Sequence, residues 1–191
     1  MTYDPFFAHI APFGPLTDED RDALRALIIY HELPQHHLLE QAGQVGRHYY
    51  FILKGASRAY LLDEAGTETT FRFSFENTFE GSFDSLRTGE PASAYIELLE
   101  PSRLLSIQSN QFAGLLLTNP NLARIAEKIS AYWIGRLADR LIRFRTMSAT
   151  QKYERIQQEY PGIVNRVSLS YIASYLGLSL ETLSRIRAKR L

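Results

Sequence analysis

Residues 169–187, LSYIASYLGLSLETLSRIR, constrain the fold most, because they have the pattern of two short helices joined by a tight turn. Ile172 and Leu176 lie one helical turn apart and give the first helix an apolar stripe, and the second helix has a similar pair. Gly177 can adopt the left-handed backbone conformation that ends one helix and turns the chain steeply. The segment therefore predicts a helix-turn-helix.

The second of these helices has a polar face suited to the major groove of DNA. Ser168 and Ser179 stand where N-caps belong, so both helices are bounded by sequence alone. Arg185 could bond a guanine edge and Glu181 could accept from cytosine N4. The candidate DNA-binding residues are Ser179, Leu180, Glu181, Thr182, Ser184, Arg185, Arg187, Lys189 and Arg190. The alternative is an ordinary helical hairpin whose Glu181 and Arg185 form a solvated ion pair.

The charge distribution agrees with a nucleic-acid-binding C-terminal part. The net charge is zero, yet from Arg136 onward eleven basic residues face only four acidic ones. A basic segment that carries a helix-turn-helix can neutralise phosphates, whereas the acidic remainder points to another task. The alternative is a chance imbalance.

Composition excludes several classes of protein. The chain has 191 residues, 45% of them hydrophobic, and no cysteine, so thiol chemistry and Cys-ligated metal are excluded. Without a long apolar run or a basic-then-apolar leader, we expect a soluble, cytoplasmic protein. Five histidines, at positions 9, 31, 36, 37 and 48, raise a cupin-like metalloenzyme as an alternative. Adjacent His36 and His37 would point to opposite faces of a strand, so we expect no metal, no cofactor and no enzyme activity.

The region up to about residue 108 predicts an antiparallel β-structure. A capped helix over 16–29 comes first, with Thr17 as its N-cap. Short segments rich in aromatic and branched residues follow, over 33–39, 48–53, 56–62, 69–75, 94–99 and 103–107. In the segment 69–75, phenylalanines alternate with polar residues, which predicts a half-buried strand with its aromatic face inward. The spacing favours a sandwich or jelly roll.

A long helix should follow this β-structure. Asn119-Pro120 is a helix start, and apolar residues then keep helical spacing to about Arg145, a rod of roughly 40 Å. The apolar band is wide, so we expect one edge to pack on its own domain and the other on a second copy. The expected dimer residues are Ile125, Ile129, Trp133, Leu137 and Leu141. The alternative is a helix buried within one chain. Ser148 and Gln151 form a capping box that starts the next helix. A hinge would lie at this break between the long helix and the DNA-reading unit.

The order of these parts resembles the Crp/Fnr family of bacterial transcription regulators. The resemblance covers nearly the whole chain and rests on three segments: 50–55 with its following turn, 79–83 with 91–94 downstream, and 172–186. It implies an α+β fold: a β-roll effector domain over 1–118, a dimerisation helix over 119–147 and a helix-turn-helix domain over 148–191. It also implies double-stranded DNA, a second copy of the chain and RNA polymerase as partners.

The resemblance also locates an effector pocket, at Gly81, Ser82, Phe83, Ala92 and Ser93. In cyclic-nucleotide-binding relatives a Glu stands at the position of Ser82 and an Arg at that of Ala92. Burying a phosphate without its cation is unfavourable by several kcal/mol. We therefore expect no functional binding of cyclic AMP or cyclic GMP, and either a different small effector or none.

Two departures from the family concern the DNA-reading unit. The family's common Arg is Leu180 here, so we expect a different operator sequence. The printed sequence ends at Leu191 without the family's wing hairpin, so we expect weaker affinity or phosphate contacts by the basic tail. A second hypothesis follows: an effector-binding or scaffold protein that kept the fold and no longer binds DNA specifically.

Overall fold

The computed structural model of the chain describes residues 3–188, the side chain of Arg143 excepted. Within these residues the strands are β1 (Ile29–Leu33), β2 (Leu38–Glu40), β3 (His48–Lys54), β4 (Ser57–Leu62), β5 (Glu68–Ser74), β6 (Phe79–Glu80), β7 (Tyr95–Leu98) and β8 (Ser102–Gln108). The α-helices are α1 (Asp4–Ile10), α2 (Asp18–Leu27), α3 (Phe83–Thr88), α4 (Ser109–Thr118), α5 (Pro120–Thr146), α6 (Ala149–Glu159), α7 (Leu169–Leu176) and α8 (Leu180–Ala188). Two 3-10 turns are η1 (Ala11–Phe13) and η2 (Ile163–Asn165).

The strands form a β-roll of two four-stranded antiparallel sheets, in the orders β1-β8-β3-β6 and β2-β7-β4-β5. Apolar side chains fill the space between the sheets, because strand residues alternate between faces. They are Leu39, Ile52, Ala59, Ile96, Leu98 and Leu104. A second cluster joins the outer face of the first sheet to α1, α2 and the start of α5. This confirms the predicted α+β fold with an antiparallel roll.

The predicted orientation of β5 is wrong. Phe73 is 2% exposed, but it packs against Tyr175 of α7 with ring centroids 5.0 Å apart, outside the roll. Arg72, on the other face of β5, forms an ion pair with Glu80 of β6. Helix α7 therefore covers Phe73, whereas Phe71 is 41% exposed and Arg72 points into the roll. Both faces of an edge strand can be buried, so alternation alone did not identify the inner one.

Other sequence-based boundaries also need correction. The predicted strand over 33–39 is two strands separated by a turn, at which His36 has a φ of 65°. Proline at position 34 cannot donate to a ladder, which explains the break. Helices α1, α3 and α4 were not predicted. In α4 no side-chain cap bond marks the N-terminus, and all of its residues are at least partly exposed, so its sequence signal is weak.

The helical half agrees closely with the sequence pattern. Asn119 caps α5, since its Oδ1 accepts from Leu122 N at 2.9 Å. Ser148 and Gln151 form the predicted capping box of α6. Gly177 is left-handed at the end of α7, with a φ of 67°. The predicted helix-turn-helix is thus confirmed as α7 and α8, with Leu183 fully buried between the helices.

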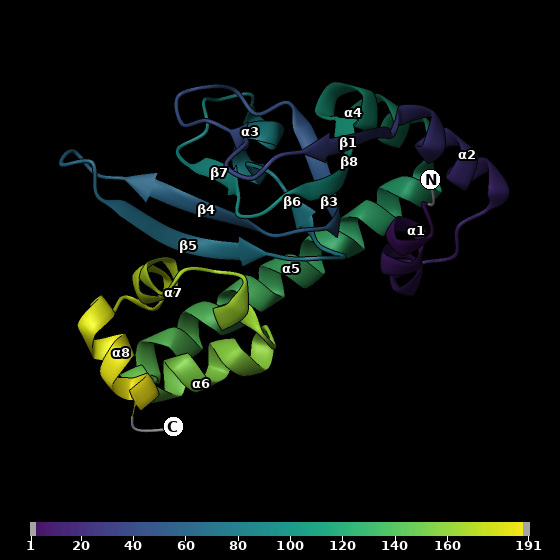
Figure 1. The fold of residues 1–191 in the computed structure, drawn as a ribbon. Coiled ribbons are helices and arrows are strands. Elements are labelled where there is room, and N and C mark those ends of the chain that lie inside the picture. Colours follow the sequence, from purple (N-terminus) through teal and green to yellow (C-terminus); the bar gives the residue numbers. More distant parts are fainter. Residues whose placement is uncertain (1–2, 189–191) are drawn as a thin grey trace.

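Figure 1 shows how α5 organises the molecule: the β-roll lies along one part of it and the helices α6 to α8 gather at its C-terminal end. The long β4–β5 hairpin extends over α7 (Figure 1). A single apolar cluster joins this hairpin to α6 and α7, with members from Ala56 and Phe73 to Ile172 and Leu183. The helix-turn-helix therefore packs directly on the β-roll.

Candidate functional site

The predicted DNA-reading face of α8 is open to solvent. Leu180, Glu181, Ser184 and Arg185 are exposed, and Arg187 is partly so. Ser179 caps the helix: its Oγ accepts from Thr182 N at 3.1 Å and donates to Thr182 Oγ1 at 2.9 Å. Lys189 and Arg190 lie outside the described residues. The face thus presents a capped first turn with an acidic side chain, Glu181, and a basic one, Arg185, one helical turn apart.

Glu181 and Arg185 form the ion pair that the alternative interpretation anticipated. The Nη2–Oε1 distance is 3.8 Å, with 69% of the Arg185 side chain and 82% of the Glu181 side chain exposed. A pair this long and this exposed contributes little to stability. Both side chains are therefore free to exchange this contact for another at little cost.

The first helix of the unit, α7, hydrogen-bonds to the free edge of β5. Ser174 Oγ accepts from Thr70 N at 2.9 Å and donates to the carbonyl oxygen of Glu68 at 3.1 Å. Unpaired backbone groups on an edge strand otherwise remain available for aggregation. The contact fixes the orientation of α7 relative to the roll, and through α7 that of α8.

Arg166 ties the segment before α7 to two acids of the roll. Its guanidinium donates to both carboxylate oxygens of Glu76, at 2.9 and 2.8 Å, and to Glu100 at 2.5 and 3.3 Å. Burial would raise the pKa of Glu76, but hydrogen bonds from Arg166 and the Gly55 amide lower it below its usual value. Such two-pronged contacts fix direction as well as distance.

Arg58 of β4 is the most buried cation of this contact, at 2% exposure. It bonds Glu97 at 3.0 and 2.8 Å and forms an ion pair with Glu68 at 2.5 Å. Its guanidinium also lies 3.7 Å from the ring centroid of Tyr171 on α7. Sequence reasoning missed Arg58 and Arg166, because their partners, Tyr171 for Arg58 and Glu76 and Glu100 for Arg166, are distant in the sequence.

The predicted effector positions lie around the start of α3, where a cation is already neutralised. Arg72 pairs with the fully buried Glu80 and donates to the carbonyl oxygen of Gly81 at 3.0 Å. Glu80 also accepts from Ser57 Oγ at 2.7 Å. Of the remaining predicted positions, Ala92 is buried, Ser82 is half-buried, and Phe83 and Ser93 are exposed. The chain's own carboxylate thus takes the cation that an anionic ligand would need.

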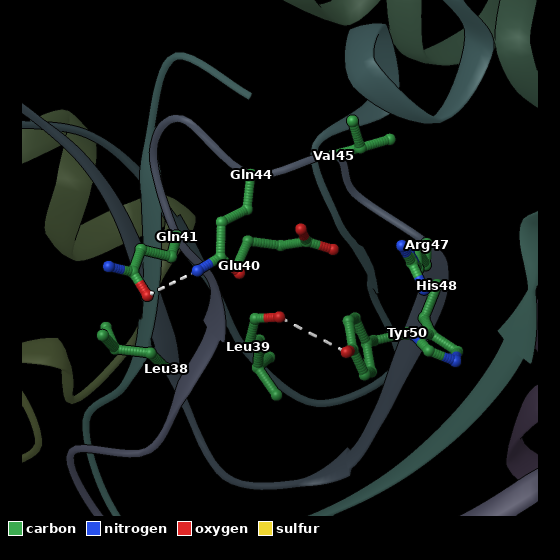
Figure 2. A pocket seen from close by; sticks show the side chains of 9 residues that line it. All are labelled: Leu38, Leu39, Glu40, Gln41, Gln44, Val45, Arg47, His48 and Tyr50. Atoms are coloured by element: carbon green, nitrogen blue, oxygen red, sulfur yellow. Dashed lines mark hydrogen bonds between the residues drawn. The ribbon is translucent and has the colours of Figure 1, made fainter. Parts of the chain in front are cut away.

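A cavity of about 600 Å³ opens beside Ala92, between β2, the loop 41–47 and β3. Figure 2 shows the Glu40 carboxylate pointing into it. Its walls are formed by Leu38, Leu39, Glu40, Gln41, Gln44, Val45, Arg47, His48 and Tyr50. Sequence reasoning missed this site, although an acid directly after two leucines in a short strand is a detectable signal.

Glu40→Gln should stabilise the protein in a pH-dependent way. Burial, aided by the negative charge of Glu80, raises the pKa of Glu40 from 4.5 to about 7. The unfolded chain releases this proton at lower pH than the folded protein does. The free energy of unfolding therefore falls as the pH rises from 4.5 to about 7. The variant should match the wild type near pH 4 and be about 3 kcal/mol more stable near pH 8. Urea unfolding at both pH values measures this; equal stability at both would contradict it.

Comparisons with known proteins agree with this architecture of β-roll, long helix and helix-turn-helix. Residues 30–119 match the family model described as cyclic nucleotide-binding domain. The cAMP-activated global transcriptional regulator CRP of Pasteurella multocida is 23% identical over 172 residues, covering 82% of this chain and 79% of that protein. Residues 30–119 thus match a cyclic nucleotide-binding domain, and the chain is similar over most of its length to a transcriptional regulator of the Crp/Fnr type.

Solved structures share the fold at low sequence identity. FixK2 from Bradyrhizobium japonicum superposes with a TM-score of 0.71 at 17% identity, over 85% of this chain and 83% of that one. The c-di-GMP responsive global regulator CLP of Xanthomonas campestris gives 0.69 at 17% identity, over 88% and 89%.

Residues 3–188 contain neither a membrane-crossing helix nor a metal-binding cluster. In this range no helix combines the length and apolar character needed to cross a membrane. Nor do three or more His, Cys, Asp or Glu side chains of the described part group closely enough to hold a metal ion. His36, instead, bonds Glu97 at 2.6 Å.

Proposed function

We propose that this protein is a homodimeric, DNA-binding regulator of transcription that binds a palindromic operator through α8. The open, polar first turns of α8 are the observation that carries the proposal. Glu181 and Arg185 would contact bases, and Ser179, Thr182 and Arg187 would contact the phosphate backbone. The division at residues 118 and 147 into effector, dimerisation and DNA-binding parts belongs to this proposal, as do RNA polymerase as a partner and the lack of enzyme activity.

An apolar stripe on α5 supports the dimer. Ile134, Leu137 and Leu141 are 64 to 68% exposed and follow the three-then-four spacing of a coiled-coil seam. Ile125 does not belong to this seam: it is 4% exposed, and its side chain lies against Gly14 of its own chain. Ile129 packs on the cluster formed with α1 and α2.

The predicted seam thus needs a shift in phase. Trp133, 36% exposed, lies at its edge, and Ile134 replaces it at the centre. Two chains that pair along this stripe would carry their α8 helices to half-sites about 34 Å apart, one turn of DNA.

Selection from a random double-stranded DNA library, followed by the salt dependence of binding, tests the proposal. We expect a two-fold symmetric motif and a steep fall of log K with log salt concentration. Retention without sequence enrichment, or no retention, would favour the scaffold hypothesis. Leu180, 51% exposed at the first position of α8, is the feature on which that hypothesis rests.

Arg185→Ala should weaken binding to the selected operator by about 1 to 3 kcal/mol, because a bidentate contact to one base pair is lost. Glu181→Ala should relax the preference at the neighbouring base pair with a smaller loss of affinity. Fluorescence anisotropy with operator and scrambled duplexes measures both effects. Arg124→Ala removes an exposed cation from α5 and serves as the charge-matched control. Normal operator binding by Arg185→Ala would refute the assignment of α8 to the groove.

Cyclic AMP and cyclic GMP should not bind in the micromolar range. Ala92 offers no cation for the phosphate, and Arg72 is held by Glu80. A buried phosphate without a cation is unfavourable by several kcal/mol. Isothermal titration calorimetry with each nucleotide measures this directly, and a micromolar Kd would overturn it.

A further inference from the structure

We propose that the cavity between β2, the loop 41–47 and β3 binds a small organic cation, with an amine or guanidinium group held by Glu40. This site adjoins the positions at which the family resemblance located an effector, because Ala92 N donates to the carbonyl oxygen of Gln44 at 2.8 Å, but none of those positions lines the cavity. The inference does not depend on the proposed DNA binding.

The Glu40 carboxylate is buried and has an oxygen atom that is free to bind a ligand. Glu40 is 7% exposed, and within residues 3–188 its Oε1 is buried without a hydrogen-bond partner. A buried carboxylate oxygen without a partner is costly, and such groups in folded proteins usually have a role. Figure 2 shows this carboxylate aimed into the cavity from β2.

The neighbouring loop is shaped to leave room for this carboxylate. A Cβ placed on Gly46 would lie 3.1 Å from Glu40 Oε2 and 3.4 Å from Ser85 Oγ. Ser85 Oγ accepts from the Gly46 amide at 2.8 Å, so it holds the loop backbone in this position. Gly46 therefore lets the loop close over Glu40 without displacing the carboxylate from the cavity.

The local charge favours a cation over an anion. Glu80, fully buried on β6, is near enough to raise the pKa of Glu40 by its negative charge. Arg72 satisfies Glu80 and is not available to Glu40. A cationic group of a ligand would neutralise Glu40 and would be the missing partner of its Oε1.

The walls define the rest of the ligand. Leu38, Leu39 and Val45 offer apolar contacts, and the ring of Tyr50 lies beside Leu39 (Figure 2). Arg47 and His48 line the wall across from Gln41 (Figure 2), so the ligand carries its positive charge only at the Glu40 end. A volume of about 600 Å³ is typical of small-molecule sites. A cation with a short alkyl body fits these walls.

Nuclear magnetic resonance titration of the full chain, without DNA, tests the proposal. The probe is n-butylguanidinium, and n-butylurea is its neutral isostere. We expect saturable amide shifts centred on residues 38–50 and their hydrogen-bonded neighbours Ser85 and Ala92, with a Kd of about 1 mM. The urea should bind at least about tenfold more weakly, because it cannot form the charge-assisted bonds to Glu40.

Matched variants separate binding from folding. Glu40→Gln should weaken n-butylguanidinium binding at least about tenfold while remaining folded, since amide and carboxyl have the same shape. Glu64→Gln, which removes an acid from the exposed β4–β5 turn, should leave the Kd unchanged. Equal binding of both probes, binding unaffected by Glu40→Gln, or no shift with n-butylguanidinium would each overturn the proposal.

Discussion

Leu137→Asp is expected to make the protein monomeric and to lower its operator affinity about 100-fold or more. Leu137 is 67% exposed and lies between Ile134 and Leu141 on the stripe that we propose as the dimer seam. The substitution would bury two unpaired carboxylates, one from each chain, at a cost of several kcal/mol. In a dimer, binding of one α8 to its half-site holds the second α8 close to the other half-site. A monomer loses this high effective concentration.

Sedimentation velocity and operator binding, measured on the same samples, check this result. Leu117→Asp is the matched control: Leu117 is 88% exposed on α4, away from the stripe, and should tolerate the same change. A Leu137→Asp protein that remains dimeric would show that another surface pairs the chains. A monomer that binds the operator with unchanged affinity would show that dimerisation does not contribute to binding.

Local rules predicted the helical half of this chain well. Caps at Ser148, Ser168 and Ser179 and the left-handed Gly177 depend on neighbours within four residues. The sequence therefore contains the whole cause of each boundary. The same holds for Asn119 at the start of α5.

Predictions failed where the cause lies far away in the chain. The phenylalanines of the segment 69–75 were expected to face into the roll, but Phe73 meets Tyr175, and Phe75 meets Tyr160 with ring centroids 4.9 Å apart. The phase of the α5 stripe was wrong for a similar reason. The Ile125 side chain packs against Gly14 of its own chain, and the periodicity of α5 does not reveal this contact.

The site was predicted in part for the same reasons. Exposure of Glu181 and Arg185 follows from the helical phase set by the buried Leu183. The lining of the Glu40 cavity comes from one continuous stretch, residues 38–50, but Ser85 holds its loop and Glu80 lies near its carboxylate. Spacing within the stretch does not indicate these distant contacts.

Arg58→Met is expected to lower the free energy of unfolding by about 3 to 5 kcal/mol. The substitution removes the cation that balances Glu97, which is itself 7% exposed and has His36 as its other partner at 2.6 Å. It also removes the contact with the Tyr171 ring that joins β4 to α7. Amide exchange in α7 should therefore become faster than in the strands of the roll. Urea unfolding and hydrogen exchange measure the two effects.

Two further variants separate the charge from the packing. Arg58→Met combined with Glu97→Gln should recover most of the lost stability, because replacing both members of a buried pair is often close to neutral. Arg103→Met breaks an exposed strand pair, in which Arg103 and Glu32 lie 3.3 Å apart, and should cost less than about 1 kcal/mol. If Arg58→Met costs no more than Arg103→Met, the buried pair does not stabilise the fold. If stability falls while exchange in α7 is unchanged, Arg58 holds the roll together and does not hold the helix-turn-helix against it.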